Sequence, residues 1–323
     1  MKRLLIAFHA LGILCIAAPH AALSQAYPAR PIRVVAPFPP GGGVDLTARV
    51  LQQRLSAGLG QPIVIENRAG ASGMIGAEYV SRSAPDGYTL AYTVGSDLAL
   101  KRFVSRAPTL DMLKDLTPIA SALESVSCIA VAGSSTVNSI TELIDLAKRN
   151  PGKLNFGSAG MNSSQHLTGE LFRQYGVDMV HVPFNGLAPG VVALMGGQIE
   201  VAITNFASVS AQLREGKVKV LAVTRPKRYE DAPHIPAVNE ALPGFNMPVA
   251  FFGFFGPPGL PRPIVMRLNA EVGKALESPE VRAKAKELYM SVIFTSPDQF
   301  AGMIRESIDA YGRIAHAARI QPQ

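Results

Sequence analysis

The segment Pro37–Asp45, PFPPGGGVD, stands between an apolar run, Ile32–Ala36, and an amphipathic segment that starts near Leu46. This order predicts a strand, a stiff turn and the start of a helix. The glycines Gly41–Gly43 permit a close approach that any Cβ would block, and the free N–H groups of a helix start attract an anion. The loop lacks the Gly-Lys-Ser/Thr ending of a phosphate loop and the GxGxxG spacing of a dinucleotide site. We therefore expect an anion cradle, for a phosphate or a carboxylate.

Short apolar runs alternate with helical periodicity along the chain, which is typical of α/β lobes with parallel sheets. At 323 residues the chain is long enough for two such lobes with separate cores. Strands are expected at Ile32–Ala36, Ile63–Glu66, Thr89–Thr93, Ile129–Val131, Asn155–Ser158, Met179–Val182, Val201–Thr204 and Val220–Val223. Helices are expected at Asp45–Leu59, Ser72–Ser83, Ile140–Asn150, Ser164–Tyr175, Pro189–Gly196, Ser208–Glu215, Pro263–Glu277 and Pro297–Ala318.

Two apolar segments without helical periodicity, Ser125–Ala132 and Met247–Phe255, bracket the middle of the chain. A chain that leaves one lobe and later returns to it needs two connections of this kind. We therefore predict a first lobe from residues 27–125 and 251–323, and a second lobe from residues 126–250.

Residues 1–26 have the pattern of a cleavable export signal. Lys2 and Arg3 precede the apolar run Leu4–Ala18, and Ser24–Ala26 forms a small-x-small cleavage site. The apolar run is shorter than the roughly 20 residues that a membrane helix needs. Cleavage at this site would leave a chain that starts at Tyr27, so we expect a soluble periplasmic protein.

The formal charge of +7 does not indicate a nucleic-acid-binding protein. The basic residues are scattered, no stacking aromatics are interleaved among them, and Trp is absent. A modest positive balance also suits a protein that gathers anionic small molecules. We favour that interpretation.

Small polar residues also stand at the carboxyl ends of three other predicted strands, in residues 93–96, 157–164 and 204–206. Ligands of open α/β sheets bind beyond these ends. Four such loops from two lobes would line one cleft. Small polar residues also cap helices, and capping is the alternative interpretation for Ser163 and Ser164.

No catalytic site is recognisable in the sequence. A G-x-S-x-G elbow is missing, and His166 follows Ser164 so closely in a predicted helix that their side chains point to different faces. His181 and His234 lack metal-ligand spacing to another ligand. Cys128, the single cysteine outside the export signal, is expected to be a buried apolar residue. We therefore expect a binding protein without a cofactor or metal, not an enzyme.

Several long stretches resemble one protein family. They are the region from YPARPIRVVAPFPPGGGVD to SAPDGYTL, and the segments LNFGSAGMNSSQHLTGELF, HVPFNG, VKVLAVTRPKRYEDAPHIPAVNEALPGF and FFGPPGLPRPIVMRLNAEV. The chain resembles the Bug-type extracytoplasmic receptors of tripartite tricarboxylate transporters. The resemblance implies an α/β, two-lobed periplasmic-binding-protein fold of the Venus-flytrap kind (type II) with two connecting strands. It also implies a receptor that captures a small carboxylate-bearing metabolite between its lobes and delivers it to membrane permease subunits.

In that family a carboxylate is held by backbone N–H groups and waters. The resemblance therefore implies a ligand site at the matching positions of this chain, which are Phe38, Pro39, Gly41, Gly42 and Asp45, then Thr93 and Ser96, and in the second lobe Ser158, Ala159, Gly160, Ser163, His166 and Asn205. From its position alone, Asp45 is expected as a first-turn acid favoured by the helix dipole.

Three places depart from the family pattern. Phe184 and Asn185 replace a frequent Tyr-Lys pair, Thr204 replaces a frequent Asp, and Val249-Ala250 replaces a frequent aromatic residue. The cleft should therefore be more apolar than is usual in the family. We expect a ligand with one carboxylate on an apolar or aromatic body.

Two other functions stay open at this point. A similar binding protein could feed a sensor kinase instead of a permease, and a periplasmic hydrolase or isomerase could use the same scaffold. A clamp that must open and close is expected to work as a monomer.

Overall fold

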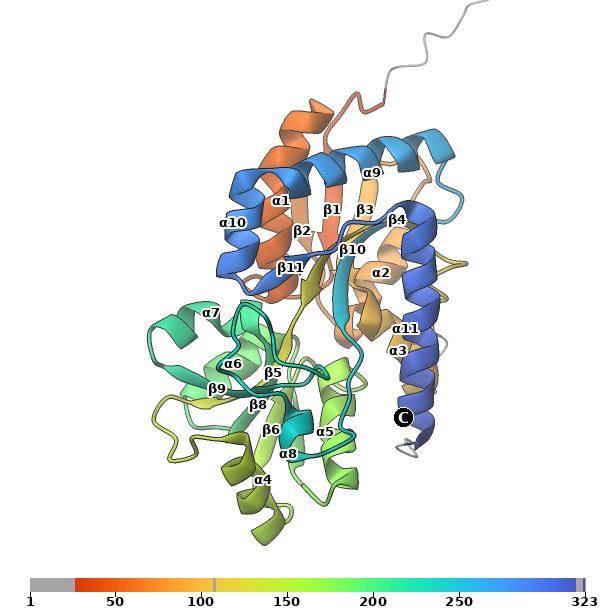
Figure 1. The fold of residues 1–323 in the computed structure, drawn as a ribbon. Coiled ribbons are helices and arrows are strands. Elements are labelled where there is room, and N and C mark those ends of the chain that lie inside the picture. The colour runs from red at the N-terminus through yellow and green to blue at the C-terminus, as the bar shows by residue number, and fades with distance from the viewer. Residues whose placement is uncertain (1–26, 107–108, 318–321, 323) are drawn as a thin grey trace, which may run out of the picture.

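The computed structural model describes residues 27–106, 109–317 and 322. These residues form two β-sheets, each flanked by helices, in two lobes stacked one above the other (Figure 1). The predicted α/β, two-lobed fold is confirmed. The expected export signal, residues 1–26, falls outside the described residues.

The first lobe is built on a six-stranded sheet of order β11-β4-β10-β3-β1-β2. β1 runs parallel to β2 and β3, whereas β10 is antiparallel to β3 and β4, and β11 is antiparallel to β4. The strands are β1 (Ile32–Ala36), β2 (Ile63–Asn67), β3 (Thr89–Val94), β4 (Thr117–Ser125), β10 (Ala250–Gly256) and β11 (Met290–Val292).

The second lobe has a five-stranded sheet of order β7-β6-β8-β5-β9. β6 is parallel to β7 and β8, and β5 is antiparallel to β8 and β9. The strands are β5 (Ser127–Ala132), β6 (Asn155–Ser158), β7 (Val180–Pro183), β8 (Val201–Asn205) and β9 (Val218–Val223).

Helices cover both sheets, and among the described helices none is long and apolar enough to span a bilayer. In the first lobe they are α1 (Gly43–Leu59), the 3-10 turn η1 (Ala71–Gly73), α2 (Met74–Ser81), α3 (Gly95–Val104), α9 (Arg262–Glu277), α10 (Pro279–Glu287) and α11 (Pro297–Ala317). In the second lobe they are α4 (Ile140–Arg149), α5 (Ser164–Gln174), α6 (Leu187–Met195), α7 (Phe206–Arg214) and α8 (Val238–Ala241).

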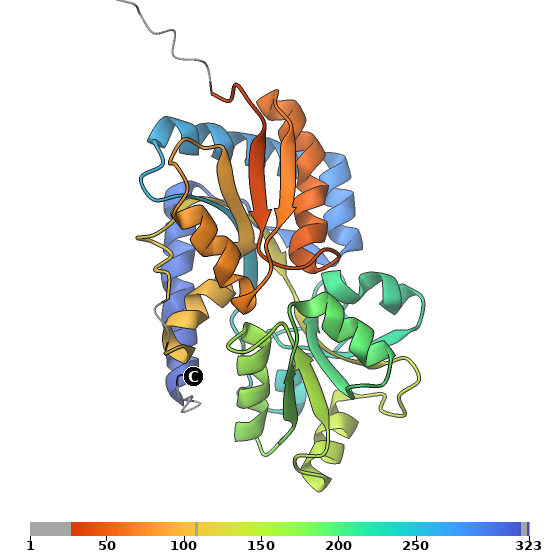
Figure 2. The same ribbon diagram turned by 180° about the vertical axis from the view of Figure 1, so that it is seen from behind.

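The chain passes between the lobes at two places. β4 ends at Ser125 in the first sheet and β5 begins at Ser127 in the second, so Val126 alone separates them. The return passes Met247, whose N–H still bonds to the Thr224 carbonyl of the second lobe, and enters the first sheet at the start of β10. Figure 2 shows both lobes from behind, with these connections between them.

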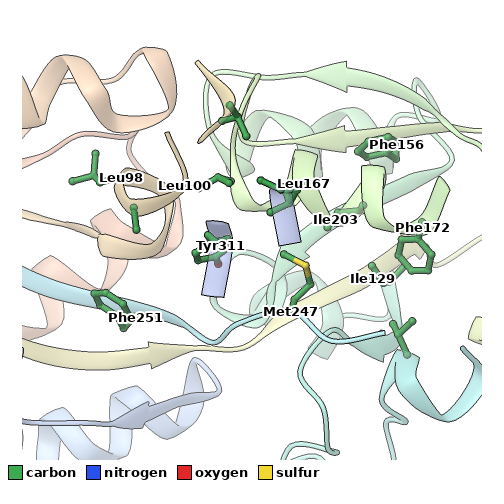
Figure 3. Packing of buried hydrophobic residues seen from close by; sticks show 14 of the residues in the cluster. Leu98, Leu100, Ile129, Phe156, Leu167, Phe172, Ile203, Met247, Phe251 and Tyr311 are labelled. Carbon is green, nitrogen blue, oxygen red and sulfur yellow. The ribbon is translucent and has the colours of Figure 1, made fainter. Parts of the chain in front are cut away.

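One apolar cluster extends through both lobes. Leu98 and Leu100 of α3 and Tyr311 of α11 belong to the same cluster of buried residues as Leu167 of α5 and Ile203 of β8 (Figure 3). This continuity means that the two lobes are closed on each other in the structure.

The loop predicted at residues 93–96 does not exist as a loop. Thr93 and Val94 end β3, and α3 begins at Gly95. The glycine is required by packing instead of by a turn, because a Cβ at Gly95 would lie 2.1 Å from the Phe251 ring. This close helix-to-strand contact moves the polar residues that follow into a buried first helical turn.

Candidate functional site

A small cavity of about 30 Å³, partly open to solvent, lies where the two lobes meet. Most of its wall is apolar. The residues that line it are Phe38, Pro39, Gly42, Gly43, Val44, Val94, Asp97, Ser125, Ala159, Gln165, Leu187, Ala188, Asn205, Ala250 and Phe252. Within the described part of the chain, no lysine, arginine or histidine lines this cavity.

The N-terminus of α1 opens into this cavity. Gly42 is the N-cap residue and has no side chain to cap the helix, while the Gly43 N–H bonds to Ser208 Oγ of the second lobe. Gly42, Gly43 and Val44 all line the cavity. Uncapped N–H groups of a helix start, together with the helix dipole, favour a bound anion. This end of the cavity is therefore the site best suited to a carboxylate.

Asn205 from the second lobe completes this donor end. Its Oδ1 accepts a hydrogen bond of 2.9 Å from the Ser208 N–H and so caps α7. The remaining amide group, Nδ2, is a donor. It lies so close to Gly43 that a Cβ there would be 3.1 Å away from it. Gly43 itself donates its N–H to Ser208 Oγ at 3.2 Å, which ties the α1 start to the second lobe.

Asp97, in the first turn of α3, brings a carboxylate to the same cavity. The residue is 2% exposed, and its Oδ1 accepts a 3.0 Å hydrogen bond from the Ser164 N–H at the start of α5. Burial raises the pKa of Asp97, while the Ser164 hydrogen bond and the Lys101 charge act in the opposite direction. The sequence prediction named the neighbouring Ser96 and missed Asp97.

Closure is held by polar contacts as well as by apolar packing. The Met161 carbonyl of the second lobe accepts hydrogen bonds from Ser72 Oγ at 2.9 Å and from Lys101 Nζ at 3.1 Å, both from the first lobe. On the other side of the cleft the Phe206 ring stacks on Tyr289, with ring centroids 4.7 Å apart. The cavity is therefore that of a closed clamp.

Comparison with known proteins identifies the family. The profile of the "Tripartite tricarboxylate transporter family receptor" matches residues 47–320. The chain belongs to this receptor family. Protein BugT of Bordetella pertussis is 34% identical over 304 residues, which covers 93% of this chain and 92% of BugT. The resemblance to Bug-type receptors is confirmed.

Solved structures of receptors agree with the fold. The periplasmic binding protein BugD is 28% identical, with a TM-score of 0.87 over 92% of this chain and 100% of BugD. R. palustris Rpa4515 with adipate is 33% identical, with a TM-score of 0.88 over 92% of this chain and 100% of that chain. MatC from Rhodopseudomonas palustris with bound malate is 32% identical, with a TM-score of 0.81 over 90% of this chain and 100% of that chain. Both of these ligands are carboxylates.

Some of the predicted site positions of this receptor line its cavity and others do not. Those that line it are Phe38, Pro39, Gly42, Ala159 and Asn205. Those that do not are Gly41, Asp45, Thr93, Ser96, Ser158, Gly160, Ser163 and His166.

Gly41 and Asp45 hold the shape of the glycine loop. The Gly41 N–H donates to Asp45 Oδ2 at 3.0 Å, and the Asp45 carboxylate also accepts hydrogen bonds from Arg49 and Asn67. Burial alone would raise the pKa of Asp45, but these hydrogen bonds lower it below its usual value. The first-turn position predicted for Asp45 is confirmed. Its carboxylate supports the loop around the cavity.

In the second lobe the predicted segment satisfies its own N–H groups. Ser163 caps α5 by accepting from the His166 N–H, which confirms the capping interpretation. The other bonds join the Gly160 N–H to Ser158 Oγ, the Asn162 N–H to His166 Nδ1, and the Ser163 N–H to the Gly160 carbonyl. Few donors of this segment are therefore left for a ligand, and Ala159 is its one cavity-lining member among residues 158–163.

His166 and His181 form a stacked pair beneath this segment, with ring centroids 4.1 Å apart. His181 Nε2 is 2.6 Å from Ser158 Oγ. Burial and the Arg173 and Lys101 charges lower the pKa of His166 to about 4, and burial and His166 lower that of His181 to about 3. Both rings are neutral at neutral pH and pack as structural residues.

Sequence reasoning also missed Gln165, Leu187 and Ala188, and the connecting-strand residues Ser125 and Phe252. Leu187 and Ala188 directly follow the segment HVPFNG, so their position next to a recognised motif was the available signal. Ala250 lies in the segment where the family's frequent aromatic residue is replaced, and the cavity reaches it.

Proposed function

We propose that this receptor captures a small carboxylate-bearing solute in the cavity between its lobes and delivers it to a membrane permease. The observation that carries the proposal is the uncapped N-terminus of α1, which opens into the cavity beside the Asn205 amide. A carboxylate placed there accepts charge-assisted hydrogen bonds without needing an arginine. Adipate and malate bound to related receptors support this chemistry.

The rest of the cavity supports a ligand with one carboxylate. Its wall contains Phe38, Val94, Leu187, Ala250 and Phe252, and no basic side chain of the described residues reaches it. A second carboxylate would lose its hydration without gaining a partner of opposite charge, which is costly. An apolar or aromatic body would fit this wall.

Closure of the lobes would let a membrane partner distinguish the liganded receptor from the empty one. The ligand contacts residues of both lobes, so it favours the closed state by the difference between its affinities for the two states. Hinge closure of this kind shields the ligand and changes the surface that a membrane partner meets. The proposed setting is the periplasm, reached through cleavage after Ala26.

Two measurements test capture. Native mass spectrometry of the protein purified from a periplasmic extract would identify a bound acid, and calorimetry would compare citrate, succinate, glutamate, nicotinate and benzoate. We expect tight binding of at least one acid with a single carboxylate. Tight binding of citrate alone would contradict the single-carboxylate hypothesis, and failure of every carboxylate would contradict capture itself.

A matched pair of variants locates the carboxylate. Asn205→Asp keeps an oxygen to cap α7 but replaces the amide donor with a charge, so binding should be lost. Asn246→Asp adds the same charge at an exposed position of the second lobe and should bind normally. If both variants bind the ligand with equal affinity, Asn205 does not contact the carboxylate.

Delivery needs its own assay. The liganded receptor should co-purify with, and stimulate uptake by, a membrane permease of the tripartite type. Co-purification with a sensor kinase, and not with a permease, would contradict the delivery step.

A further inference from the structure

Asp97 places a buried carboxyl group in one part of the cavity wall. It is buried, it lines the cavity, and its Oδ1 accepts a hydrogen bond from the Ser164 N–H. Lys101 attracts Asp97 through its charge, but no salt bridge between these two described residues is found. A buried carboxylate in this state gains from any cation or strong donor that reaches it.

Gln165, the residue that follows Ser164, adds a second acceptor. It lines the same cavity, is 5% exposed, and its Oε1 has no hydrogen-bond partner among the described residues. Buried side-chain oxygens nearly always have a partner, so a buried oxygen without one at a cavity wall indicates a missing donor. Asp97 and Gln165 come from different lobes, and the Ser164 hydrogen bond holds them together.

Lys101 does not supply the missing donor at Asp97 and Gln165. Lys101, one turn further along α3, attracts the Asp97 charge but donates its Nζ hydrogen bond to the Met161 carbonyl. Lys101 does not line the cavity, and His166 is neutral at neutral pH. The cavity therefore has donors at the α1 start and acceptors at Asp97 and Gln165.

We propose that Asp97 and Gln165 form a subsite for a protonated amino group, so that the receptor selects amino carboxylates over diacids of similar length. This inference rests on the proposed function, because it assigns the carboxylate of the same ligand to the α1 start. An ammonium group has three N–H donors and can satisfy both oxygens. A second carboxylate in its place would need Asp97 to be protonated and would still face the unpartnered Gln165 oxygen, which disfavours binding.

Matched ligands test the subsite. Calorimetry would compare straight-chain acids of three to six carbons that end in an ammonium, a methyl or a second carboxylate group, together with the 2-amino acids of the same lengths. We expect an amino acid to bind at least about tenfold more tightly than its methyl and carboxylate counterparts, the effect of one charged hydrogen bond. Asp97→Asn keeps an oxygen for the Ser164 N–H and should reduce this preference about tenfold.

Two further variants keep the test decisive. Asp145→Asn removes the same charge from an exposed position on α4 and should leave the preference unchanged. Gln165→Met removes the unpartnered oxygen without touching the Ser164 hydrogen bond, and should reduce the preference even if Asp97→Asn does not fold.

The outcomes separate the two proposals. Diacids that bind as tightly as amino acids, or a preference that survives both Asp97→Asn and Gln165→Met, would overturn the amino subsite and leave carboxylate capture intact. Failure of every acid in the series to bind would overturn the subsite, and carboxylate capture would fall with it only if citrate, nicotinate and benzoate also failed to bind.

Discussion

Replacement of Lys101 by methionine should weaken ligand binding without contact between Lys101 and the ligand. Lys101 donates to the Met161 carbonyl across the cleft at 3.1 Å and is 7% exposed. Methionine keeps the length of the apolar stem and removes the ammonium group. The contact joins the two lobes, so its loss destabilises the closed state relative to an open one.

The size of the effect follows from two opposing terms. A hydrogen bond that involves a charged group contributes about 1.5–3 kcal/mol, equivalent to roughly 10- to 150-fold in an equilibrium constant. Burial of the ammonium group offsets part of this, as the lowered pKa of Lys101 shows. The Met161 carbonyl also keeps its hydrogen bond from Ser72 Oγ, so no buried acceptor is left without a partner. We therefore expect an effect at the lower end of this 10- to 150-fold range, that is, about tenfold weaker binding.

Calorimetry with the acid identified by native mass spectrometry measures this loss, and small-angle scattering measures the fraction of closed molecules with and without ligand. Lys148→Met, at an exposed position of α4, is the matched control. If the affinity of Lys101→Met stays within about twofold of both the control and the wild type, the Lys101–Met161 contact does not stabilise the closed state, because closure and binding are linked thermodynamically. Unchanged scattering with a lower affinity would lead to the same conclusion.

Three further predictions concern the loop, the histidines and the cysteine. Gly42→Val should abolish ligand binding with little change in the melting temperature, because its Cβ would make only an ordinary 3.5 Å contact with the Pro39 carbonyl but would enter the cavity. Retained affinity would show that this glycine is only a turn element. The stacked His166 and His181 have pKa values of about 4 and about 3 in the folded chain, below the ordinary 6.5, so the unfolded chain takes up their protons at higher pH. Above about pH 6.5 the free energy of unfolding should therefore not be lowered by these histidines. Between pH 6.5 and pH 4 it should fall by roughly 1 kcal/mol per pH unit for each histidine, and the fall should be shallower in the His181→Phe variant. Denaturant titrations at a series of pH values would measure this dependence. Cys128 is fully buried and burial raises its pKa, so a thiol reagent should modify it only after unfolding; rapid labelling of the native protein would contradict this.

The sequence indicated those elements whose apolar residues follow a regular period. β1, β6 and most helices lie within a residue or two of the predicted ranges. α3 was missed because its first residues, Gly95 and Ser96, resemble a loop, whereas the glycine is needed to pack against Phe251. β4 was missed because Pro118 and Glu124 interrupt its apolar pattern. In both cases a contact with a distant part of the chain decides the local structure.

The site, too, could be predicted only where its residues are adjacent in the sequence. The glycine loop was predicted because its strand, glycines and helix start are adjacent in sequence. Asp97 and Gln165 belong to the cavity only because α3 and α5 meet across the cleft, and no sequence period reports that contact. Ser163, in contrast, carries a local signal, but the signal fits a helix cap as well as a ligand contact, and the structure shows the cap.

The starts of α1 and α5 differ in what their N–H groups bind. The first N–H of α1, that of Gly43, bonds to the neutral Ser208 hydroxyl at the edge of the cavity, whereas the first N–H of α5 bonds to the carboxyl group of Asp97. The protein thus places a carboxyl group of its own at the start of α5. The unpartnered Gln165 Oε1 accepts from a ligand, and so does Asp97 in its ionised form, so the two ends of the cavity favour opposite chemistry. A solute that satisfies both must carry its anionic group toward α1 and a donor toward α3, and this polarity fixes the orientation in which the ligand is held.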